Sequence, residues 1–405
     1  MNKRALLIAI PLLTAAALLI CCFIPKTERA TAAVRHSIAS ASFGDHMAVA
    51  SAADFAVGSA YAVPDFSENI DLMDEIWDRN CSTQYPMYSG DELKMRRLSM
   101  AGLGNVNYVY TDGKQVLFSR QNKSGGSYDL LLWDTVSGNT DLIFTSDSPG
   151  YKIHDPILTS DGIYWIVASD TIDVNTGIWQ LYFCSLPDMS VAQVRAFDDN
   201  SAQLLTPRLT AAGGAIFWIE GVEHGGAPEY SVYRLNSDSA PEVLFHFHYL
   251  YNPYYVLHIS SGYLSVLDYY DSAWRVVIFD LESSSLLTYT ITELLDGEYP
   301  VYTVFNGDVL AYSTSYSQLY LHSADSPQAQ AVGYADYGFD IVGNYLFHQN
   351  RGTVCAYDIA SGQNSYLVCD ESLTPVAAAV NDGLAFFLAI PNGDFESPLL
   401  FTVTA

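Results

Sequence analysis

The chain has 405 residues, half of them hydrophobic, so it is long enough to bury a large core and is not disordered throughout. It carries 18 basic and 45 acidic residues, for a formal net charge of -27, and no lysine follows Lys152. This balance argues against nucleic-acid binding, because neutralising phosphates requires clustered Lys and Arg. The acidity is typical of a solubilising surface, with a cationic ligand or Ca²⁺ as the sharper alternative.

The N-terminus has the features of a membrane-crossing segment. Lys3 and Arg4 precede an almost uninterrupted apolar run over residues 5–24, which matches the roughly 30 Å of hydrocarbon that a helix must cross. We predict that residues 1–25 are a membrane anchor or signal sequence and that residues 5–24 form a single transmembrane helix. The alternative is secretion after cleavage near Ala32. Both interpretations place everything beyond Pro25 outside the cytoplasm.

Residues 26–90 are rich in Ala and Ser and show no steady helical or strand period over most of their length. This composition predicts a flexible tether. Within it, the segment SENIDLMDEIWDRN begins with a Ser cap and places Ile70, Met73, Ile76 and Trp77 on one helical face. A short helix is therefore expected near residues 67–80.

Seven copies of one β-hairpin pattern fill residues 91–405. Each copy has an apolar or alternating strand, a tight turn with glycine, and a second strand dense in aromatic and β-branched residues. Asp-Gly and Asn-Gly turns supply the positive φ angles of two-residue hairpins. The turn glycines lie 36 to 52 residues apart, at Gly113, Gly162, Gly214, Gly262, Gly307, Gly343 and Gly383.

That spacing fits one four-stranded propeller blade for each copy, because most hairpins continue into a third and a fourth strand. We therefore predict an all-β fold, a β-propeller of about seven four-stranded blades, with six or eight also possible. The last copy reaches Ala405 after only three candidate strands. The segment DELKMRRLSMAG, just before the first blade, is expected to supply the missing strand and so close the ring.

These hairpins resemble the bacterial extracytoplasmic propellers of the TolB-like and WD40-like kind. In those proteins a hairpin with a DG turn is followed by a strand that ends in D-x-x-S-G. The resemblance covers roughly residues 103–405 and is carried by SDGIYW with LYFCSLPD and by NYVYTDGKQVLFS with LLLWDTVSG. It implies an architecture and no particular activity, since such propellers host many unrelated roles.

One motif points to catalysis. His154-Asp155-Pro156 is similar to the opening strand of five-bladed glycosidases, in which the Asp is the catalytic base, and Glu220 is the nearest second carboxylate by repeat position. A structural role is favoured, because Thr206-Pro207 and Thr374-Pro375 hold the equivalent place without an acid. The sequence contains no complete sialidase box, G-x-S-x-G elbow, P-loop or H-E-x-x-H motif.

The histidines and cysteines give no metal or cofactor prediction. His246 and His248 alternate on a strand but have no identifiable third ligand, so a packing or surface role is expected. Cys355 and Cys369 are equally distant from the turn residue Gly362. In a regular hairpin they would lie opposite one another, as a cross-strand disulfide or as two free thiols.

The connections between blades predict a binding face. They are rich in tyrosine, which gives rigid amphipathic contact area, and contain nearby acids; the alternative is that tyrosine, with 29 copies in the chain, fills blade edges. The predicted ligand-binding residues are Tyr151, Tyr251, Tyr254, Tyr299, Tyr334, Tyr337, Asp155 and Glu298.

Three functions remain open from the sequence. The first is a non-catalytic surface module that binds a protein, peptide or glycan. The second is a carbohydrate-active enzyme using Asp155. The third is an extracytoplasmic sensor or assembly scaffold of a membrane complex.

Overall fold

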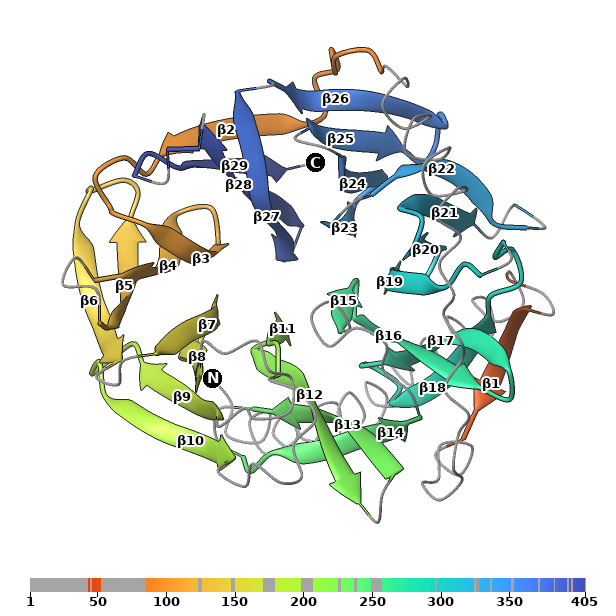
Figure 1. Cartoon of the computed structure of the whole chain (residues 1–405), viewed down its shortest axis with the longest axis horizontal. Helices are drawn as coiled ribbons and strands as arrows, with labels where there is room; N and C mark the ends of the chain where they lie inside the picture. The colour runs from red at the N-terminus through yellow and green to blue at the C-terminus, as the bar shows by residue number, and fades with distance from the viewer. Residues whose placement is uncertain are drawn as a thin grey trace, which may run out of the picture.

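Seven β-sheets are arranged in a ring in the computed structural model of the chain (Figure 1). The structure describes the following residues: 43, 46–51, 85–122, 126–146, 150–169, 179–197, 207–224, 227–236, 239–248, 257–295, 297–323, 326, 328–335, 337–350, 353–370, 372–381, 383–391, 393–394 and 396–404.

The first four blades follow the chain, and in each the inner strand comes first and the outer strand last. Successive strands pair antiparallel, as expected for sheets built from hairpins. Their strands are β3 (Val106–Thr111), β4 (Gln115–Gln121), β5 (Tyr128–Asp134) and β6 (Thr140–Ser146) in blade 1; β7 (Tyr151–Leu158), β8 (Gly162–Ser169), β9 (Trp179–Ser185) and β10 (Val191–Phe197) in blade 2; β11 (Thr210–Ala212), β12 (Ala215–His224), β13 (Ala227–Leu235) and β14 (Glu242–Phe247) in blade 3; and β15 (His258–Ser260), β16 (Tyr263–Tyr270), β17 (Ala273–Asp280) and β18 (Ser285–Thr290) in blade 4.

Blades 5 and 6 repeat this order, and blade 7 combines strands from both ends of the propeller. The strands are β19 (Pro300–Phe305), β20 (Val309–Thr314), β21 (Gln318–Ser323) and β22 (Gln330–Tyr334) in blade 5; β23 (Tyr337–Val342), β24 (Tyr345–Asn350), β25 (Thr353–Asp358) and β26 (Gln363–Cys369) in blade 6; and β27 (Leu373–Asn381), β28 (Leu384–Pro391), β29 (Leu399–Thr404) and β2 (Lys94–Ser99) in blade 7.

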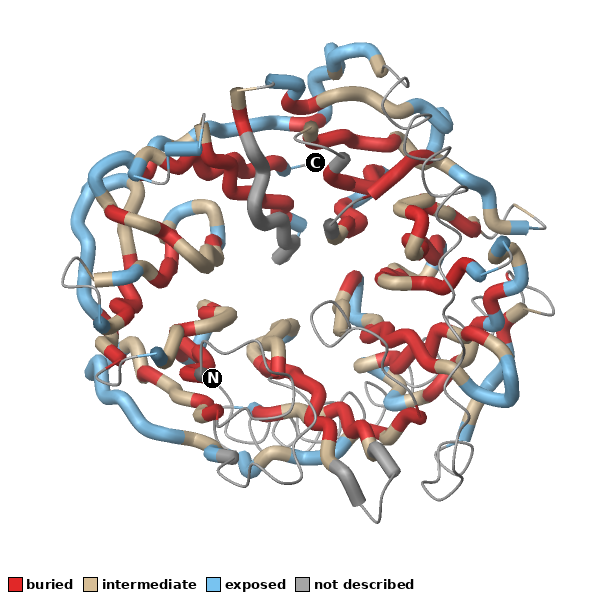
Figure 2. Tube along the Cα trace, in the orientation of Figure 1, coloured by how far each residue is buried: buried red, intermediate tan, exposed pale blue. Residues whose placement is uncertain are grey.

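Both faces of each sheet are covered by the neighbouring blades. The described residues contain seven hydrophobic clusters, and each cluster joins two adjacent blades. All six residues of β20 are buried, whereas β6, an outer strand, begins with three exposed residues. Figure 2 shows the same trend, with burial concentrated in the inner part of the ring and exposure on the rim. This double burial explains the continuous apolar runs of the second strands.

The predicted closure is confirmed. β2 pairs with β29 over six residues, from Lys94 with Thr404 to Ser99 with Leu399. Met100, directly after β2, is fully buried between blade 7 and blade 1. A strand from the start of the propeller thus covers the outer edge of its last three strands.

Six of the seven turn glycines have the positive φ that their turns require. Gly162 is different, because its φ is ordinary and its constraint is close contact. A Cβ there would lie 2.3 Å from the carbonyl oxygen of Cys184 and 2.4 Å from the Phe183 ring.

The tether prediction needs correction where residues 26–90 are described. Phe43 is buried, and β1 (Met47–Ala50) pairs with β18 as a fifth strand of blade 4. Near Tyr88 the chain runs beside blade 6, where the Tyr88 amide donates to the Tyr366 carbonyl at 2.8 Å. Both parts lie on the rim of the ring rather than free of it (Figure 1).

The predicted transmembrane helix and the predicted helix near residues 67–80 lie outside the described residues. Among the residues that are described, no helix has the length and apolar character needed to cross a membrane.

The closing segment gives a matched pair of methionines for a stability test. Met100 is fully buried and Met95 is 47% exposed. We expect Met100→Ala to lower the free energy of unfolding by about 2 to 5 kcal/mol, because it leaves a cavity between blades 7 and 1. Met95→Ala should stay within about 0.5 kcal/mol. Denaturant unfolding of the chain in detergent, followed by tryptophan fluorescence, measures both; equal effects would contradict closure by this segment.

Candidate functional site

The two flat faces of the ring are built differently. The connections from each blade to the next form the connection face, of which the structure describes residues 150, 207–209, 248, 257, 291–295 and 297–299, among others. The tight turns after the inner strands form the hairpin face. The inner strands β3, β7, β11, β15, β19, β23 and β27 surround the centre (Figure 1).

The inner strands are irregular toward the connection face. Five of them have a register shift against the second strand of their blade, and each shift comes before the last two residues of the inner strand. Bulges of this kind redirect side chains and are common beside functional sites. The shifts lie between Val106 and Tyr108, His154 and Ile157, Pro300 and Tyr302, Tyr337 and Phe339, and Pro375 and Ala377.

Asp155 lies in the bulge of β7 with a φ of 43°. The other non-glycine residues of positive φ in the described parts of the chain lie in turns, so Asp155 is unusual for its place within a strand. Backbone of this kind persists where the surroundings hold it, and it often marks functional sites.

A first axial cluster joins the inner strands of blades 1 and 2 to Arg208, which lies just before β11 of blade 3. Arg208 Nε donates to Asp155 Oδ2, and its guanidinium carbon lies 5.7 Å from the centre of the Tyr108 ring. The Tyr108 hydroxyl and His154 Nδ1 are 2.8 Å apart and share a hydrogen bond. Together these contacts hold the bulged part of β7 between its two neighbours.

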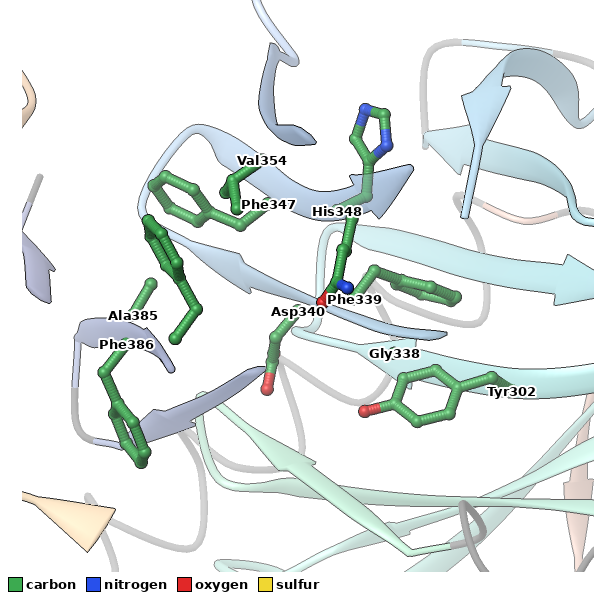
Figure 3. A pocket seen from close by; sticks show the side chains of 11 residues that line it. Tyr302, Gly338, Phe339, Asp340, Phe347, His348, Val354, Ala385 and Phe386 are labelled. Carbon is green, nitrogen blue, oxygen red and sulfur yellow. The ribbon is translucent and has the colours of Figure 1, made fainter. Parts of the chain in front are cut away.

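A second axial cluster has the same kinds of side chain from blades 4, 5 and 6. His258 Nδ1 lies 3.5 Å from Asp340 Oδ2 and 3.3 Å from the Tyr302 hydroxyl. The His258 and Tyr302 rings are 4.2 Å apart. Tyr302 and Asp340 also line a cavity of about 30 Å³, shown in Figure 3, which has room for about one water molecule.

Each axial cluster reaches past one blade. The Arg208 and Tyr108 contact joins blades 3 and 1, and the His258 and Asp340 contact joins blades 4 and 6. Side chains from alternate blades can meet only where they extend toward the centre of the ring. Two groups, each containing Tyr, His and Asp, therefore line the centre below the connection face.

Tyr270 is an exposed aromatic residue of this face that sequence reasoning missed. It is 37% exposed beside the turn between β16 and β17. Its ring stacks on His248 at 4.6 Å, and Arg275 lies 4.5 Å from the ring centre. Its one signal in the sequence is that it directly precedes the polar pair Asp271-Ser272. In the structure these two residues form a turn, and both have a positive φ angle.

Asp268 holds the two residues that flank Tyr270. Its carboxylate accepts from Arg275 Nε at 2.8 Å and from the His248 amide at 2.9 Å. Burial by itself would raise the pKa of Asp268, but the hydrogen bond from His248 and the charge of Arg275 hold it below its usual value. This buried carboxylate fixes the aromatic surface above it.

The predicted tyrosines and Glu298 do not all lie at the surface. Tyr299 and Tyr334 are buried, which fits packing better than ligand contact, and Tyr151 is half-buried. Glu298 is buried as well; it accepts from Thr314 Oγ1 and from the Leu295 amide at 2.8 Å. Tyr251, Tyr254 and the side chain of Tyr337 lie outside the described residues.

Asp155 and Glu220 belong to different ion pairs. Glu220 is buried, accepting from Trp218 Nε1 at 2.8 Å and from Arg195 Nη2 at 2.7 Å. Both Glu220 oxygens are therefore occupied, one by Trp218 of its own strand and the other by Arg195, which joins blade 3 to the outer strand of blade 2. This geometry favours the structural interpretation of the two acids over the catalytic one.

The cysteine prediction is wrong in its register. The strands pair from Asp358 with Gln363, so the turn is centred between Ala360 and Ser361 rather than on Gly362. Cys355 therefore lies opposite Tyr366, and Cys369 lies opposite Thr353 on the other side of a bulge. Both cysteines are free thiols. Burial raises the pKa of Cys355 to about 12, which suppresses its reactive thiolate.

The histidine pair is divided between two partners. His246 shares a hydrogen bond with Ser231 Oγ, whereas His248 faces Asp268. No group of three metal-ligating side chains occurs within the described part of the chain.

An open cleft of about 320 Å³ lies on the hairpin face of blades 1 to 3. It is lined by Tyr110, Leu158, Leu186 and the glycine turn at Gly213-Gly214, among others. Its size is at the low end for small-molecule sites. The cleft is on the side opposite to the predicted binding face.

No family model and no curated protein matches this chain. Among solved structures, YCF48 bound to D1 peptide superposes with a TM-score of 0.51 at 11% identity, over 80% of this chain and 98% of the other. A prolyl endopeptidase gives 0.49 at 11% identity, over 74% and 50%, so this chain spans half the length of that protein. TolB from Acinetobacter baumannii gives 0.38 at 9% identity, over 73% and 65%.

At these identities the likeness shows the fold alone. The chain is a seven-bladed β-propeller, and TolB is among the propellers that it resembles.

A double-mutant cycle tests the first axial cluster. We expect Asp155→Asn and Arg208→Met to show a coupling free energy of about 1 to 3 kcal/mol, because one removal leaves the other charge poorly paired near the centre. The control pair is Arg234 with Glu242, an ion pair on outer strands whose glutamate is 49% exposed; it should couple by less than about 1 kcal/mol. Unfolding free energies of the four chains in each cycle give the values, and a weaker coupling for the axial pair than for the control would contradict this geometry.

Proposed function

We propose that this chain is a membrane-tethered, extracytoplasmic propeller that acts as a non-catalytic binding or scaffold module for a protein, peptide or glycan. The binding surface in this proposal is the connection face. The observation that carries it is the rigidly held Tyr270, partly exposed on a face whose inner strands are bulged in five blades.

Tyr270 has the properties of a binding anchor. Its ring is oriented before any ligand arrives, because His248 covers one part of it and Arg275 another. A pre-oriented aromatic side chain loses little conformational freedom on binding, and Tyr and Arg are the residues most often found at binding hot spots. The same ring surface is suited to a sugar or to an apolar side chain of a peptide.

Charge supports a partner with cationic or neutral character. The net charge of -27 repels acidic partners and attracts basic ones over a distance that depends on salt. The axial clusters add paired charges rather than a free catalytic acid. In this proposal they act as polar contacts at the floor of the binding face.

The enzymatic alternative is tested by one substitution. Under the binding proposal, purified chain should give no turnover on a panel of oligosaccharides, with or without the Asp155→Asn substitution. Turnover by the wild-type chain that Asp155→Asn abolishes would favour the carbohydrate-active enzyme instead.

The binding face is tested with Tyr270→Ala. The detergent-solubilised chain is first used with peptide and glycan arrays and with membrane extracts to identify a ligand. We then expect Tyr270→Ala to weaken that ligand by about 1 to 2 kcal/mol, or roughly five- to thirtyfold in Kd, without a change in unfolding.

Val136→Ala is the control for this experiment, because Val136 is 84% exposed next to β5 on the opposite face. It should bind like wild type. A loss of affinity in Val136→Ala with none in Tyr270→Ala would move the site to the hairpin face.

A further inference from the structure

A segment outside the ring fills the groove between blades 4 and 5. This rim segment consists of Phe43 and residues 46–50. Phe43 is 2% exposed, and its ring centre lies 6.2 Å from Tyr289 of β18, 5.7 Å from Phe305 of β19 and 5.1 Å from His322 of β21. One aromatic side chain therefore contacts strands of both blades.

Backbone pairing extends the contact along blade 4. β1 pairs antiparallel with β18 from Met47 with Tyr289 to Ala50 with Leu286. Met47 is buried, whereas Val49 is 65% exposed. A strand added to a sheet edge, with one large side chain in a pocket, is a recurring mode of peptide recognition.

The pocket beneath Phe43 is built by the propeller itself. The hydroxyl of Tyr289 lies 2.6 Å from His322 Nδ1, and His322 Nε2 donates to the Ser326 carbonyl at 2.9 Å. Because a carbonyl only accepts, the neutral His322 ring donates from Nε2 and accepts from Tyr289 at Nδ1. The rim segment adds His46, which stacks on Tyr289 at 5.7 Å.

We propose that this groove is a strand-docking site whose occupant is the chain's own rim segment, and that docking makes the membrane tether leave the propeller at the rim of blade 4. The inference rests on the proposed membrane tether for its consequence, but the docking itself does not. It goes beyond ligand binding by defining a second interaction surface on the molecule.

Docking changes the reach of the tether. The stretch from Pro25 to Phe43 spans at most about 60 to 65 Å when fully extended, whereas the stretch from Pro25 to Tyr85 spans at most about 200 to 215 Å. Docking therefore holds the propeller close to the membrane and by its edge. The connection face then remains to one side of the attachment point.

Hydrogen exchange on the full chain in detergent tests the docking. Phe43→Ala removes the aromatic anchor, so the amides of Met47–Ala50 should exchange at least about tenfold faster than in wild type. Val49→Ala, on the exposed side of the same strand, should leave their exchange unchanged. Unchanged exchange of β12 and β20 in Phe43→Ala shows that the propeller is still folded. Equal protection of Met47–Ala50 in wild type and Phe43→Ala would overturn the proposal.

A synthetic peptide tests the groove as a binding site. The peptide FGDHMAVAS, which corresponds to residues 43–51, should bind the Phe43→Ala chain at least about tenfold more tightly than it binds wild type, where the groove is occupied. The peptide AGDHMAVAS is the control and should bind neither. Equal binding of both peptides would show that Phe43 does not select the groove.

Dilution separates the chain's own segment from that of a second copy. Docking within one chain predicts the same protection of Met47–Ala50 over a hundredfold dilution in detergent. Protection that is lost on dilution would assign the occupant to a second copy and overturn docking within one chain.

The same hydrogen-exchange measurement can be made at two pH values. Burial lowers the pKa of His322, and the groups that face it are His46, Tyr289 and Glu293. A histidine that is buried in its neutral form favours docking above pH about 6.5, and the docked state loses stability as the pH falls below that value. After correction for intrinsic exchange rates, Met47–Ala50 should be less protected at pH 5.5 than at pH 7.5. Equal or greater protection at pH 5.5 would contradict the covering of His322 by the rim segment.

These outcomes are independent of the proposed binding function, because none needs a ligand or a membrane. A chain that docks the rim segment but binds nothing would leave the inference intact and refute the binding proposal. Membrane attachment is checked separately by resistance of the full chain to carbonate extraction.

Discussion

Burial of both faces of every sheet is the constraint on which this molecule depends. A four-stranded sheet with two apolar faces is insoluble alone, and each blade is covered by the blades on either side. The ring must close for the first and last blades to be covered as well. Pairing β2 with β29 joins residues about 300 positions apart, but the entropy of loop closure rises only with the logarithm of length. The entropy cost of closing the ring is therefore small compared with the free energy gained by burying the apolar faces of the first and last blades.

The sequence predicts this arrangement well because the signal is local and repeated. Turn glycines and apolar second strands recur within each blade, and the missing strand at the C-terminus indicated where the closing strand must come from. The rim segment gave no such signal, since Phe43 is buried by residues about 250 or more positions away in the chain. Its neighbours are small residues whose pattern is equally typical of a linker. The pairing of Cys355 with Cys369 was predicted wrongly because it takes Gly362 as the centre of the turn, whereas the strands pair from Asp358 with Gln363 and so put Cys355 opposite Tyr366.

The residues of the candidate site, too, are only partly predictable from the sequence. The Asp-Pro motif points to Asp155, but no motif points to Arg208, His258 or Asp340, because their contacts with Tyr108 and with each other join alternate blades and depend on the geometry of the whole ring. Tyr299 and Glu298 were chosen as surface residues because they lie in a connection. That connection turns inward, so that Tyr299 packs between blades 4 and 5 and Glu298 bonds to blade 5. Composition shows that a connection is rich in tyrosine, but it does not show which rings turn toward the core.

The ring architecture separates positions where a substitution disturbs the core from positions where it changes only the surface. A substitution in a second strand such as β20 changes the packing of two neighbouring blades at once, because both faces of that strand are buried. On the connection face the inner strands have bulges and a backbone amide is held by the Asp268 side chain, so a change in an exposed residue such as Tyr270 alters a surface rather than a core. The N-terminal region is attached elsewhere, on the outer edges of blades 4, 6 and 7. The N-terminal contacts at the rim and the inner strands around the centre therefore belong to different strands.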